Sequence, residues 1–300
     1  MKKLWNALNL VWNHPLNCRR KKAALGSWLS WHLRSRLDPN PVVIPFVNDS
    51  KLRIKKGMAG ATGNIYTGLH EFPEMSFTLQ LLRPGDLFID VGANVGSYTI
   101  LASSAARAKT ISIEPIPRLY EDLIENIRLN QIESLVDARN IGVGDKKEKL
   151  IFTSSLETIN HVLRENEIGD ASSIEVPVET LDSIVGSSCP KLIKVDAEGF
   201  ETPVIRGADQ ILSQQTLLAV ILELHGAGKF YGYDEEEIHR KIIGYGFKTY
   251  AYLPFERRLI VKDGIHQAPY STLYIRNISQ VEKILRSSPR FLIHGASTEI

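Results

Sequence analysis

The chain has 300 residues, of which 43% are hydrophobic, and a formal net charge of +2 at pH 7. A chain of this size and composition can bury a sizeable core, and it fits one α/β domain with appended segments better than two equal domains. Its two cysteines, Cys18 and Cys189, are too few for a disulfide framework and lack metal-ligand spacing, so we expect a cytoplasmic location.

Residues 1–37 are basic and have helical spacing. They hold eight Lys and Arg residues and no Asp or Glu, whereas the rest of the chain holds 28 basic and 34 acidic residues. Leu4, Leu8 and Trp12 recur at helical spacing, and Pro15 separates this helix from a second one. The segment lacks the pattern of a signal peptide, and no run of about 18 apolar residues occurs to span a membrane. Four tryptophans among positive charges favour peripheral contact with the inner membrane surface, although packing against the domain is an equal alternative.

Residues 38–74 are predicted to be a linker with short strands and a candidate cap on the substrate side. The sequence Asp38-Pro39-Asn40-Pro41 opens this segment, short strands are expected over 42–47 and 52–54, and a Gly-rich stretch follows. The main domain is expected over 75–278, and a C-terminal helix and tail over 279–300.

Within the main domain, strand and helix patterns alternate. This alternation predicts an α/β fold with a mostly parallel sheet and helices on both faces, which ends in antiparallel strands. Strands are expected over residues 87–91, 110–114, 136–143, 192–195, 217–223, 247–253, 258–261 and 272–276, and helices over 94–107, 117–130, 201–213 and 234–245.

The most informative motif follows the first of these strands, where an apolar run ends at Asp90 and glycines precede a helix. Gly92 and Gly96 allow backbone N–H groups to approach a ligand. Dinucleotide-binding folds use G-x-G-x-x-G, whereas Asn94 stands here where a middle glycine would admit a pyrophosphate. The loop therefore favours a nucleoside-like cofactor over NAD, although similar loops occur in α/β proteins that bind no nucleoside.

A second acidic residue strengthens this interpretation. Glu114 lies 24 residues after Asp90, at the end of the next predicted strand and before Pro115, where a carboxylate can accept hydrogen bonds from both hydroxyls of a ribose. Asn140 and Gly142, near the end of the third predicted strand, complete the residues that we assign to the cofactor site.

Three charged residues end another apolar strand. Lys194, Asp196 and Glu198 are two residues apart, so they share one face while the strand continues. If this strand neighbours that of Asp90, the acids face the transferred group, because ligands of open α/β sheets bind where the strand order reverses. The alternative is that these charges pair with one another and cap the next helix. His225, at a third strand end, is a further candidate for proton transfer.

We expect no metal at these acids, because neither their spacing nor a third obvious oxygen ligand indicates one. A nucleic-acid enzyme would be more basic around its cleft, so no nucleic-acid partner is expected. The oligomeric state does not follow from the sequence.

Taken together, these motifs resemble the FkbM family of S-adenosylmethionine (SAM)-dependent methyltransferases. The resemblance extends over about residues 60–276, and its most specific part is the sequence Lys194-Val195-Asp196-Ala197-Glu198-Gly199-Phe200-Glu201, followed by Gly207-Ala208. The glycine loop, Glu114-Pro115 and Leu181-Asp182 also contribute to it. Ala197 stands where the family often has Val.

The resemblance implies a class I methyltransferase fold, with a seven-stranded sheet and SAM above the first two strands. It also implies O-methylation of a sugar or natural-product hydroxyl, with Lys194, Asp196, Glu198 and His225 in the catalytic region. Asn13-His14-Pro15 weakly resembles the leader of members tied to surface-polysaccharide biosynthesis. The alternatives are N-methylation, an NAD-dependent nucleotide-sugar enzyme, and a catalytically silent scaffold.

Overall fold

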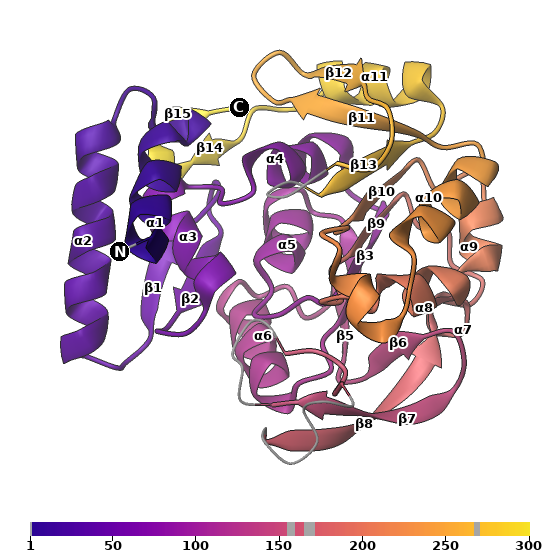
Figure 1. Cartoon of the computed structure of the whole chain (residues 1–300). Coiled ribbons are helices and arrows are strands. Elements are labelled where there is room, and N and C mark those ends of the chain that lie inside the picture. Colours follow the sequence, from indigo (N-terminus) through magenta and orange to yellow (C-terminus); the bar gives the residue numbers. More distant parts are fainter. Residues whose placement is uncertain (1, 155–159, 165–171, 267–270) are drawn as a thin grey trace.

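The structure is a computed structural model, and it describes residues 2–154, 160–164, 172–266 and 271–300. A central sheet has helices on both faces, and the two ends of the chain meet in a separate layer at one side (Figure 1).

The central sheet has eight strands in the order β12-β11-β13-β10-β9-β3-β4-β5. The strands from β10 to β5 are parallel, and β13, β11 and β12 are joined by antiparallel pairs. Chain order reverses between β3 and β9, which makes their carboxyl ends the switch point where ligands bind in open α/β sheets. The strands are β3 Leu87–Val91, β4 Lys109–Ile113, β5 Val136–Arg139, β9 Leu192–Val195, β10 Ala219–Leu222, β11 Lys248–Leu253, β12 Arg258–Val261 and β13 Thr272–Ile275.

This topology confirms the predicted mostly parallel α/β sheet and its antiparallel end. Strand β12 extends the implied seven strands to eight by pairing with β11. The neighbouring position of β3 and β9, on which the expected site depends, is also confirmed, since Asp90 is the register partner of Lys194.

Successive strand residues pack into two separate cores, as the alternation of side chains along a strand requires. Phe88 packs into one core with helices α4, α5, α6 and α11, whereas Ile89 packs into the other with α7 to α10. Figure 1 shows these two helical layers on either side of the sheet. The helices are α4 Phe72–Leu81, α5 Ser97–Ile100, α6 Pro117–Leu129, α7 Leu181–Val185, α8 Glu201–Arg206, α9 Asp209–Ser213, α10 Glu235–Gly244 and α11 Ile278–Arg286.

Three predicted elements are interrupted at places where the backbone must turn. The expected strand 136–143 divides into β5 and β6 (Gly142–Gly144), which belong to different sheets. The expected helix 201–213 breaks at Gly207, where a Cβ atom would collide with the carbonyl oxygen of Gly144. The expected helix 94–107 begins only at Ser97 and continues as a π-helical turn over Leu101–Ala105.

A small sheet, of which β6 is one strand, contains two further strands that the sequence prediction missed. It has the order β6-β8-β7, with β7 over Glu148–Thr153 and β8 over Ser173–Thr180. Pro177 within β8 argued against a strand, because proline lacks the N–H group that a ladder needs. This sheet places Phe152 and Gly142 beside the end of β4, as described below.

The N-terminal part is helical, as expected, and leads into a short hairpin. Helix α1 covers Lys2–Asn13 and α2 covers Lys21–Leu37, while β1 (Val42–Pro45) pairs with β2 (Lys51–Ile54). The Gly-rich stretch, for which the sequence analysis predicts no helix, forms α3 over Ala59–Thr67. Among the described residues, every helix is too short or too polar to cross a bilayer.

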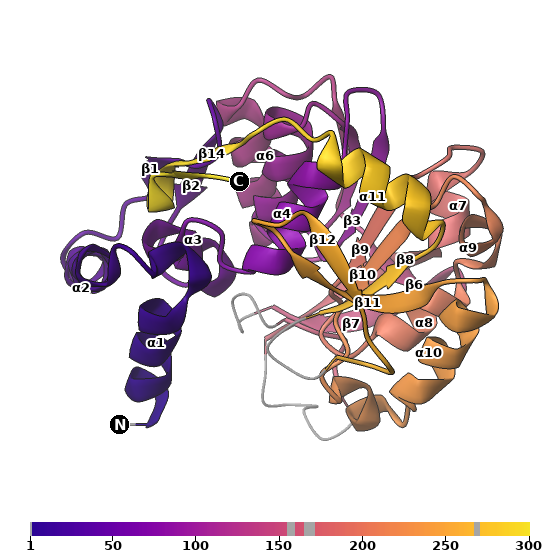
Figure 2. The same cartoon turned by 90° about the horizontal axis from the view of Figure 1, so that it is seen from above.

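The C-terminal residues return to this N-terminal part. After α11, strands β14 (Leu292–Ile293) and β15 (Thr298–Glu299) form a hairpin beside β1 and β2 (Figure 2). Val47 and Ile293 form a β-bridge, and backbone hydrogen bonds join Asn48 to Leu292 and His294 to Phe46.

Candidate active site

The loop between β3 and α5 has a fixed, partly left-handed backbone. Gly92, Asn94 and Gly96 have φ values of 76°, 52° and 92°. A Cβ atom at Gly92 would collide with the carbonyl oxygen of Asp196, and one at Gly96 would lie 2.6 Å from a Leu123 methyl group. The two glycines therefore let this loop pack closely against β9 and α6.

Glu114 holds the same loop from the end of β4. Its carboxylate accepts hydrogen bonds from the backbone N–H groups of Asn94 (2.8 Å) and Ile116 (2.9 Å). The side chain is buried, and this burial raises the pKa of Glu114 to about 7 against the opposing effect of the two hydrogen bonds. Each carboxylate oxygen can accept a further bond, so Glu114 can bind ribose hydroxyls while it holds the loop.

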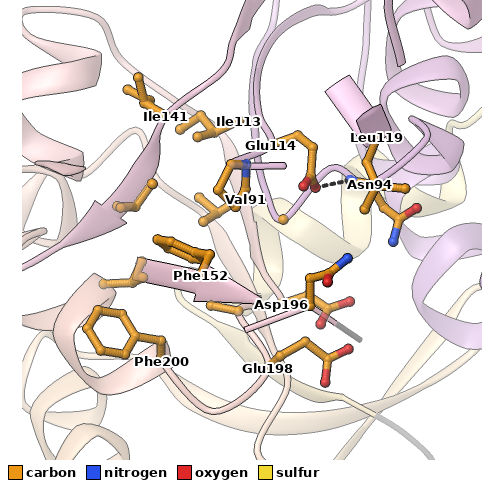
Figure 3. A pocket seen from close by; sticks show the side chains of 17 residues that line it. Val91, Asn94, Ile113, Glu114, Leu119, Ile141, Phe152, Asp196, Glu198 and Phe200 are labelled. Atoms are coloured by element: carbon orange, nitrogen blue, oxygen red, sulfur yellow. Dashed lines mark hydrogen bonds between the residues drawn. The ribbon is translucent and has the colours of Figure 1, made fainter. Parts of the chain in front are cut away.

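Glu114 lines a cavity that we call the Glu114 cavity, and Figure 3 shows its hydrogen bond to Asn94. Pro115 and Gly142 also line this cavity. Asp196 and Glu198 form its polar border, and the remaining wall is largely apolar. The apolar side chains belong to Val91, Ile113, Leu119, Ile141, Val143, Phe152, Phe200 and Val204.

This combination fits the nucleoside part of SAM. An apolar wall suits a flat base, and a buried carboxylate at the end of the second strand suits a ribose. Gly92 and Asn94 would lie along the bound cofactor because they line the same cavity.

Other predicted cofactor residues act through this loop. The Asn140 side-chain amide donates to the carbonyl oxygens of Glu114 (2.8 Å) and Pro115 (3.0 Å), so it fixes the turn after β4. Asp90 is buried and accepts a hydrogen bond of 2.7 Å from the Thr99 hydroxyl. Burial raises the pKa of Asp90. Its contact with Thr99 ties β3 to the helix after the loop.

A second cavity adjoins the first, and we call it the acid-lined cavity. Gly92, Asn94, Asp196 and Glu198 line both cavities. The acid-lined cavity also has the carboxylates of Glu71, Asp90 and Glu223, the Tyr98 ring and the Lys194 ammonium in its wall.

Lys194 and Asp196 form an ion pair at the end of β9. Lys194 Nζ lies 2.8 Å from Asp196 Oδ2 and 4.8 Å from the centre of the Tyr98 ring. Burial would lower the pKa of Lys194, but the carboxylates of Asp196, Glu71 and Asp90 outweigh it and hold this pKa well above its ordinary value. Burial likewise opposes ionisation of Asp196, and Lys194 nevertheless keeps the pKa of Asp196 below its usual value. Both groups are therefore charged at neutral pH.

Glu198 follows in a left-handed turn, with a φ of 51°. The sequence pattern predicts Glu198 on the same strand face as Lys194 and Asp196. Strand β9 ends at Val195, however, so the turn and not the strand sets the position of Glu198. Burial, followed by the nearby charge of Asp196, raises the pKa of Glu198 to about 7. Glu201, at the start of α8, accepts hydrogen bonds from the N–H groups of Ala197 (2.8 Å) and Gly199 (3.2 Å) and so fixes this turn.

Glu223 is the third carboxylate at this place. Carboxylate oxygens of Asp196, Glu198 and Glu223 lie within 4.8 Å of one another, a spacing that suits a metal ion. A third oxygen donor is thus present, contrary to the reason given for expecting no metal. Burial raises the pKa of Glu223 to about 8, and Asp196 adds to the effect. His225 Nδ1 lies 2.9 Å from Glu223 Oε1, and His225 lines a different cavity, beside Gly226 and Lys229.

The sequence prediction did not include Glu71 and Tyr98, which both line the acid-lined cavity. The Tyr98 hydroxyl donates a hydrogen bond of 2.6 Å to Glu71 Oε2. Glu71 comes from the turn before α4, in a segment with no catalytic motif, and only the fold brings it to Tyr98.

Leu181-Asp182 is structural, because the Asp182 carboxylate accepts hydrogen bonds from the first N–H groups of α9, at Gln210 and Ile211.

The strand order, the reversal between β3 and β9 and the carboxylate at the end of β4 define a class I methyltransferase fold. A family model described as "Methyltransferase FkbM domain" matches residues 90–249, just over half of the chain. The chain therefore belongs to the FkbM methyltransferase family. This membership confirms the resemblance of its motifs and the prediction of SAM as its cofactor.

Two curated relatives and one solved structure are similar to the chain. Hexuronic acid methyltransferase AglP of Haloferax volcanii is 27% identical over 150 residues, which cover 49% of this chain and 59% of AglP. Methyltransferase sdnD of Sordaria araneosa is 23% identical over 173 residues, which cover 46% of this chain and 66% of sdnD. The chain thus matches less than two thirds of either relative. A crystal structure of methyltransferase FkbM from Methylobacillus flagellatus KT gives a TM-score of 0.43 at 12% identity and covers 85% of this chain and 60% of that one.

Proposed function

We propose that the protein is a SAM-dependent O-methyltransferase that acts on a hydroxyl group of a sugar in a glycan, a polysaccharide precursor or a natural product. The observation that carries this proposal is the pair of adjoining cavities, which share Gly92, Asn94, Asp196 and Glu198. The Glu114 cavity suits the cofactor. The acid-lined cavity beside it supplies carboxylates for an acceptor hydroxyl.

The reaction needs a group that takes the acceptor proton. SAM, when bound, supplies a methyl group attached to a positively charged sulfur. Glu198 takes the hydroxyl proton at a carboxylate oxygen, because its pKa of about 7 leaves it half ionised at neutral pH. Asp196, paired with Lys194, orients the hydroxyl. Glu223, next to the two acids, contacts His225.

A second candidate function is N-methylation of an amino sugar. The carboxylates of the acid-lined cavity would attract an ammonium group as well as accept hydrogen bonds from a hydroxyl. Methyl transfer to an amine requires the neutral amine, so its rate would follow the acceptor's own pKa. An NAD-dependent reaction finds no support, because the loop lacks the glycines of a pyrophosphate site and the family is one of methyltransferases.

The direct test is mass spectrometry of glycans from cells with and without the gene. A methyl-sized mass difference on a sugar oxygen is the expected result, and fragmentation distinguishes oxygen from nitrogen. Unchanged glycans, together with methylation of a non-sugar compound by the purified protein, would overturn the sugar assignment.

We also propose that α2 places the protein at an anionic membrane surface. Leu29, Leu33 and Leu37 are spaced at four-residue intervals and are 53%, 53% and 86% exposed, so they form a stripe along one face of the helix. The segment around them carries only positive charges, which complement anionic headgroups. Figure 1 shows α2 at the outer edge of the molecule, away from the sheet.

Vesicle co-sedimentation tests this contact. The full chain should bind vesicles that contain phosphatidylglycerol more strongly than purely zwitterionic ones, and Leu33→Glu with Leu37→Glu should abolish the difference. Val261→Glu, on the equally exposed edge strand β12, is the matched control. Equal sedimentation of the double variant and the parent would rule out the α2 surface.

A further inference from the structure

A groove on the N-terminal side of the molecule combines uncharged polar side chains with apolar ones and one carboxylate, that of Glu71. It lies between α1 and the turn that leads into α4, and its volume of about 350 Å³ is within the range of roughly 300–1,000 Å³ of small-ligand sites. Asn6, Asn9 and Asn13 of α1 line it, because their spacing of three and four residues places them on one helix face. We call this cavity the asparagine groove.

The groove leads toward the candidate active site. Glu71 lines both the asparagine groove and the acid-lined cavity, so the two spaces lie on either side of one side chain. The acid-lined cavity in turn shares four residues with the Glu114 cavity. A molecule that reacts beside Asp196 and Glu198 would reach α1 by passing Glu71.

The polar groups of the groove match sugar hydroxyls. An asparagine side chain offers both donors and an acceptor without a charge, as a hydroxyl group does. Asn13 Nδ2 donates to Asn9 Oδ1 at 2.7 Å, which fixes two of these amides relative to each other. Two histidines of the groove are neutral at pH 7, because burial lowers the pKa of His14 to about 4 and also lowers the pKa of His70.

An aromatic surface adjoins these amides. Phe72 lines the groove, and the Phe255 ring lies 5.1 Å from it between centroids. Phe255 is 57% exposed, whereas Phe72 is buried beneath it. Because Phe255 contacts a residue that lines the groove, its ring can offer an apolar face to the C–H face of a sugar ring, while the asparagines offer polar groups to its hydroxyls.

The charges near the reaction centre restrict the sugar. Five carboxyl groups line the acid-lined cavity, those of Glu71, Asp90, Asp196, Glu198 and Glu223; the pKa values of about 7 for Glu198 and about 8 for Glu223 leave these two partly protonated at neutral pH. Lys194 also lines it, but this ammonium is held by Asp196 at 2.8 Å. A carboxylate on the acceptor would meet net negative charge at short range and would be repelled.

From these features we infer that the acceptor is an oligosaccharide without a carboxylate group, whose reacting unit occupies the acid-lined cavity while neighbouring units lie in the asparagine groove. This inference rests on the proposed sugar acceptor. It adds that the acceptor has several units, carries no carboxylate and lies along the asparagine groove. It differs from the hexuronic acid named for the relative from Haloferax volcanii.

Glycan arrays with the full-length protein test the inference. The probes are immobilised neutral, amino and uronic-acid oligosaccharides of one to six units, read with fluorescently labelled protein in the presence of S-adenosylhomocysteine. We expect binding to at least one neutral or amino oligosaccharide, with tetrasaccharides preferred to their monosaccharide unit by at least about tenfold. Asn9→Ala and Phe255→Ala should each weaken that binding about fivefold or more. Asn40→Ala, at an exposed asparagine outside the groove, should leave it unchanged.

The same variants are then compared in methyl transfer to the best-bound glycan and to its monosaccharide unit. Asn9→Ala should lower the rate with the longer acceptor toward the rate with its monosaccharide unit, because Asn9 contacts distant units only. Preference for uronic-acid glycans, no binding to any array member, or binding unaffected by both variants would overturn the inference. Methylation of monosaccharide and tetrasaccharide at equal efficiency would refute acceptor binding in the groove, but it would still support the proposed sugar methyltransferase activity. Glycan binding without methylation would refute the proposed function, but it would still support glycan binding in the groove.

Discussion

The hydroxyl of Tyr98 donates a hydrogen bond of 2.6 Å to Oε2 of Glu71, and this contact joins the helix after the cofactor loop to the turn before α4. The Tyr98 ring also covers the Lys194 ammonium at 4.8 Å. One side chain thus connects the N-terminal part of the molecule to the ion pair at the end of β9.

Replacing Tyr98 with Phe removes this donor and keeps the ring. We expect the KM for the acceptor to rise severalfold, because Glu71 loses the group that holds it between the groove and the acid-lined cavity. The free energy of unfolding should fall by about 1–2 kcal/mol, the cost of one lost hydrogen bond to a carboxylate. Affinity for S-adenosylhomocysteine, measured by calorimetry, should not change. Tyr233→Phe, outside both cavities, serves as the control, and an unaltered acceptor KM in Tyr98→Phe would refute this role.

Glu114→Ala should weaken binding of SAM and S-adenosylhomocysteine by tens-fold or more. The expected loss is roughly 2–4 kcal/mol, for two charged hydrogen bonds to ribose hydroxyls. The substitution also frees the N–H groups of Asn94 and Ile116, so the loop becomes less fixed. Calorimetry measures the affinity, with Glu121→Ala on the exposed side of α6 as the control. Unchanged affinity in a folded Glu114→Ala protein would exclude Glu114 from the cofactor site.

Variants of the two acids after β9, Asp196 and Glu198, should differ in how methyl transfer depends on pH. If Glu198 takes the acceptor proton, kcat must rise with pH through about 7, because only its ionised form accepts a proton. Glu198→Gln should lower kcat by about 10²–10⁴-fold and remove this rise. Asp196→Asn should also lose methyl transfer and retain cofactor binding, because the charge that holds Lys194 is gone. Parental turnover in both variants would make His225 the next residue to test.

Glu74, buried in α4, should make stability depend on pH. Burial raises its folded pKa to about 8 from a usual value of 4.5, so the folded protein keeps a proton that the unfolded chain releases. Its contribution to stability is fully present below the unfolded pKa and is lost as pH rises through the folded pKa. Glu74→Gln should therefore become more stabilising, relative to the parent, between about pH 5 and pH 8, by roughly 2–4 kcal/mol. Urea unfolding at both pH values measures this, and a pH-independent difference would contradict it.

We expect methyl transfer to persist after treatment with a chelator. Asp196, Glu198 and Glu223 have the spacing of a cation site, but Lys194 already places a positive charge 2.8 Å from Asp196. Activity is measured after dialysis against EDTA and again with added magnesium. Loss with EDTA and recovery with magnesium would show that the three carboxylates hold a metal.

The parts of the fold that the sequence predicts best are buried strands that end in charged or glycine residues. Strands β3 and β9 have the expected boundaries, since each is a short apolar run before a motif. Strand β8 was not predictable, because its Pro177 and exposed acidic residues resemble a loop. The break at Gly207 depends on its contact with Gly144, about 60 residues away, which no local pattern contains.

The candidate site likewise contains residues that local motifs predict and residues that only the fold brings together. Asp90, Glu114, Lys194 and Asp196 belong to motifs at strand ends, so their positions follow from the order of the sheet. Glu71 lies outside any such motif and reaches the site only because α4 packs against α5 and its continuation. The roles of Asn140 and Gly96 in fixing the backbone, rather than in touching a ligand, likewise depend on packing partners distant in sequence.

The pairing of residues 46–48 with residues 292–294 sets an order on synthesis. A ribosome makes residues 46–48 long before it makes residues 292–294, which pair with them. Residues 1–70 must therefore wait, with part of their apolar surface uncovered, until residues 292–294 have been made and can close on residues 46–48.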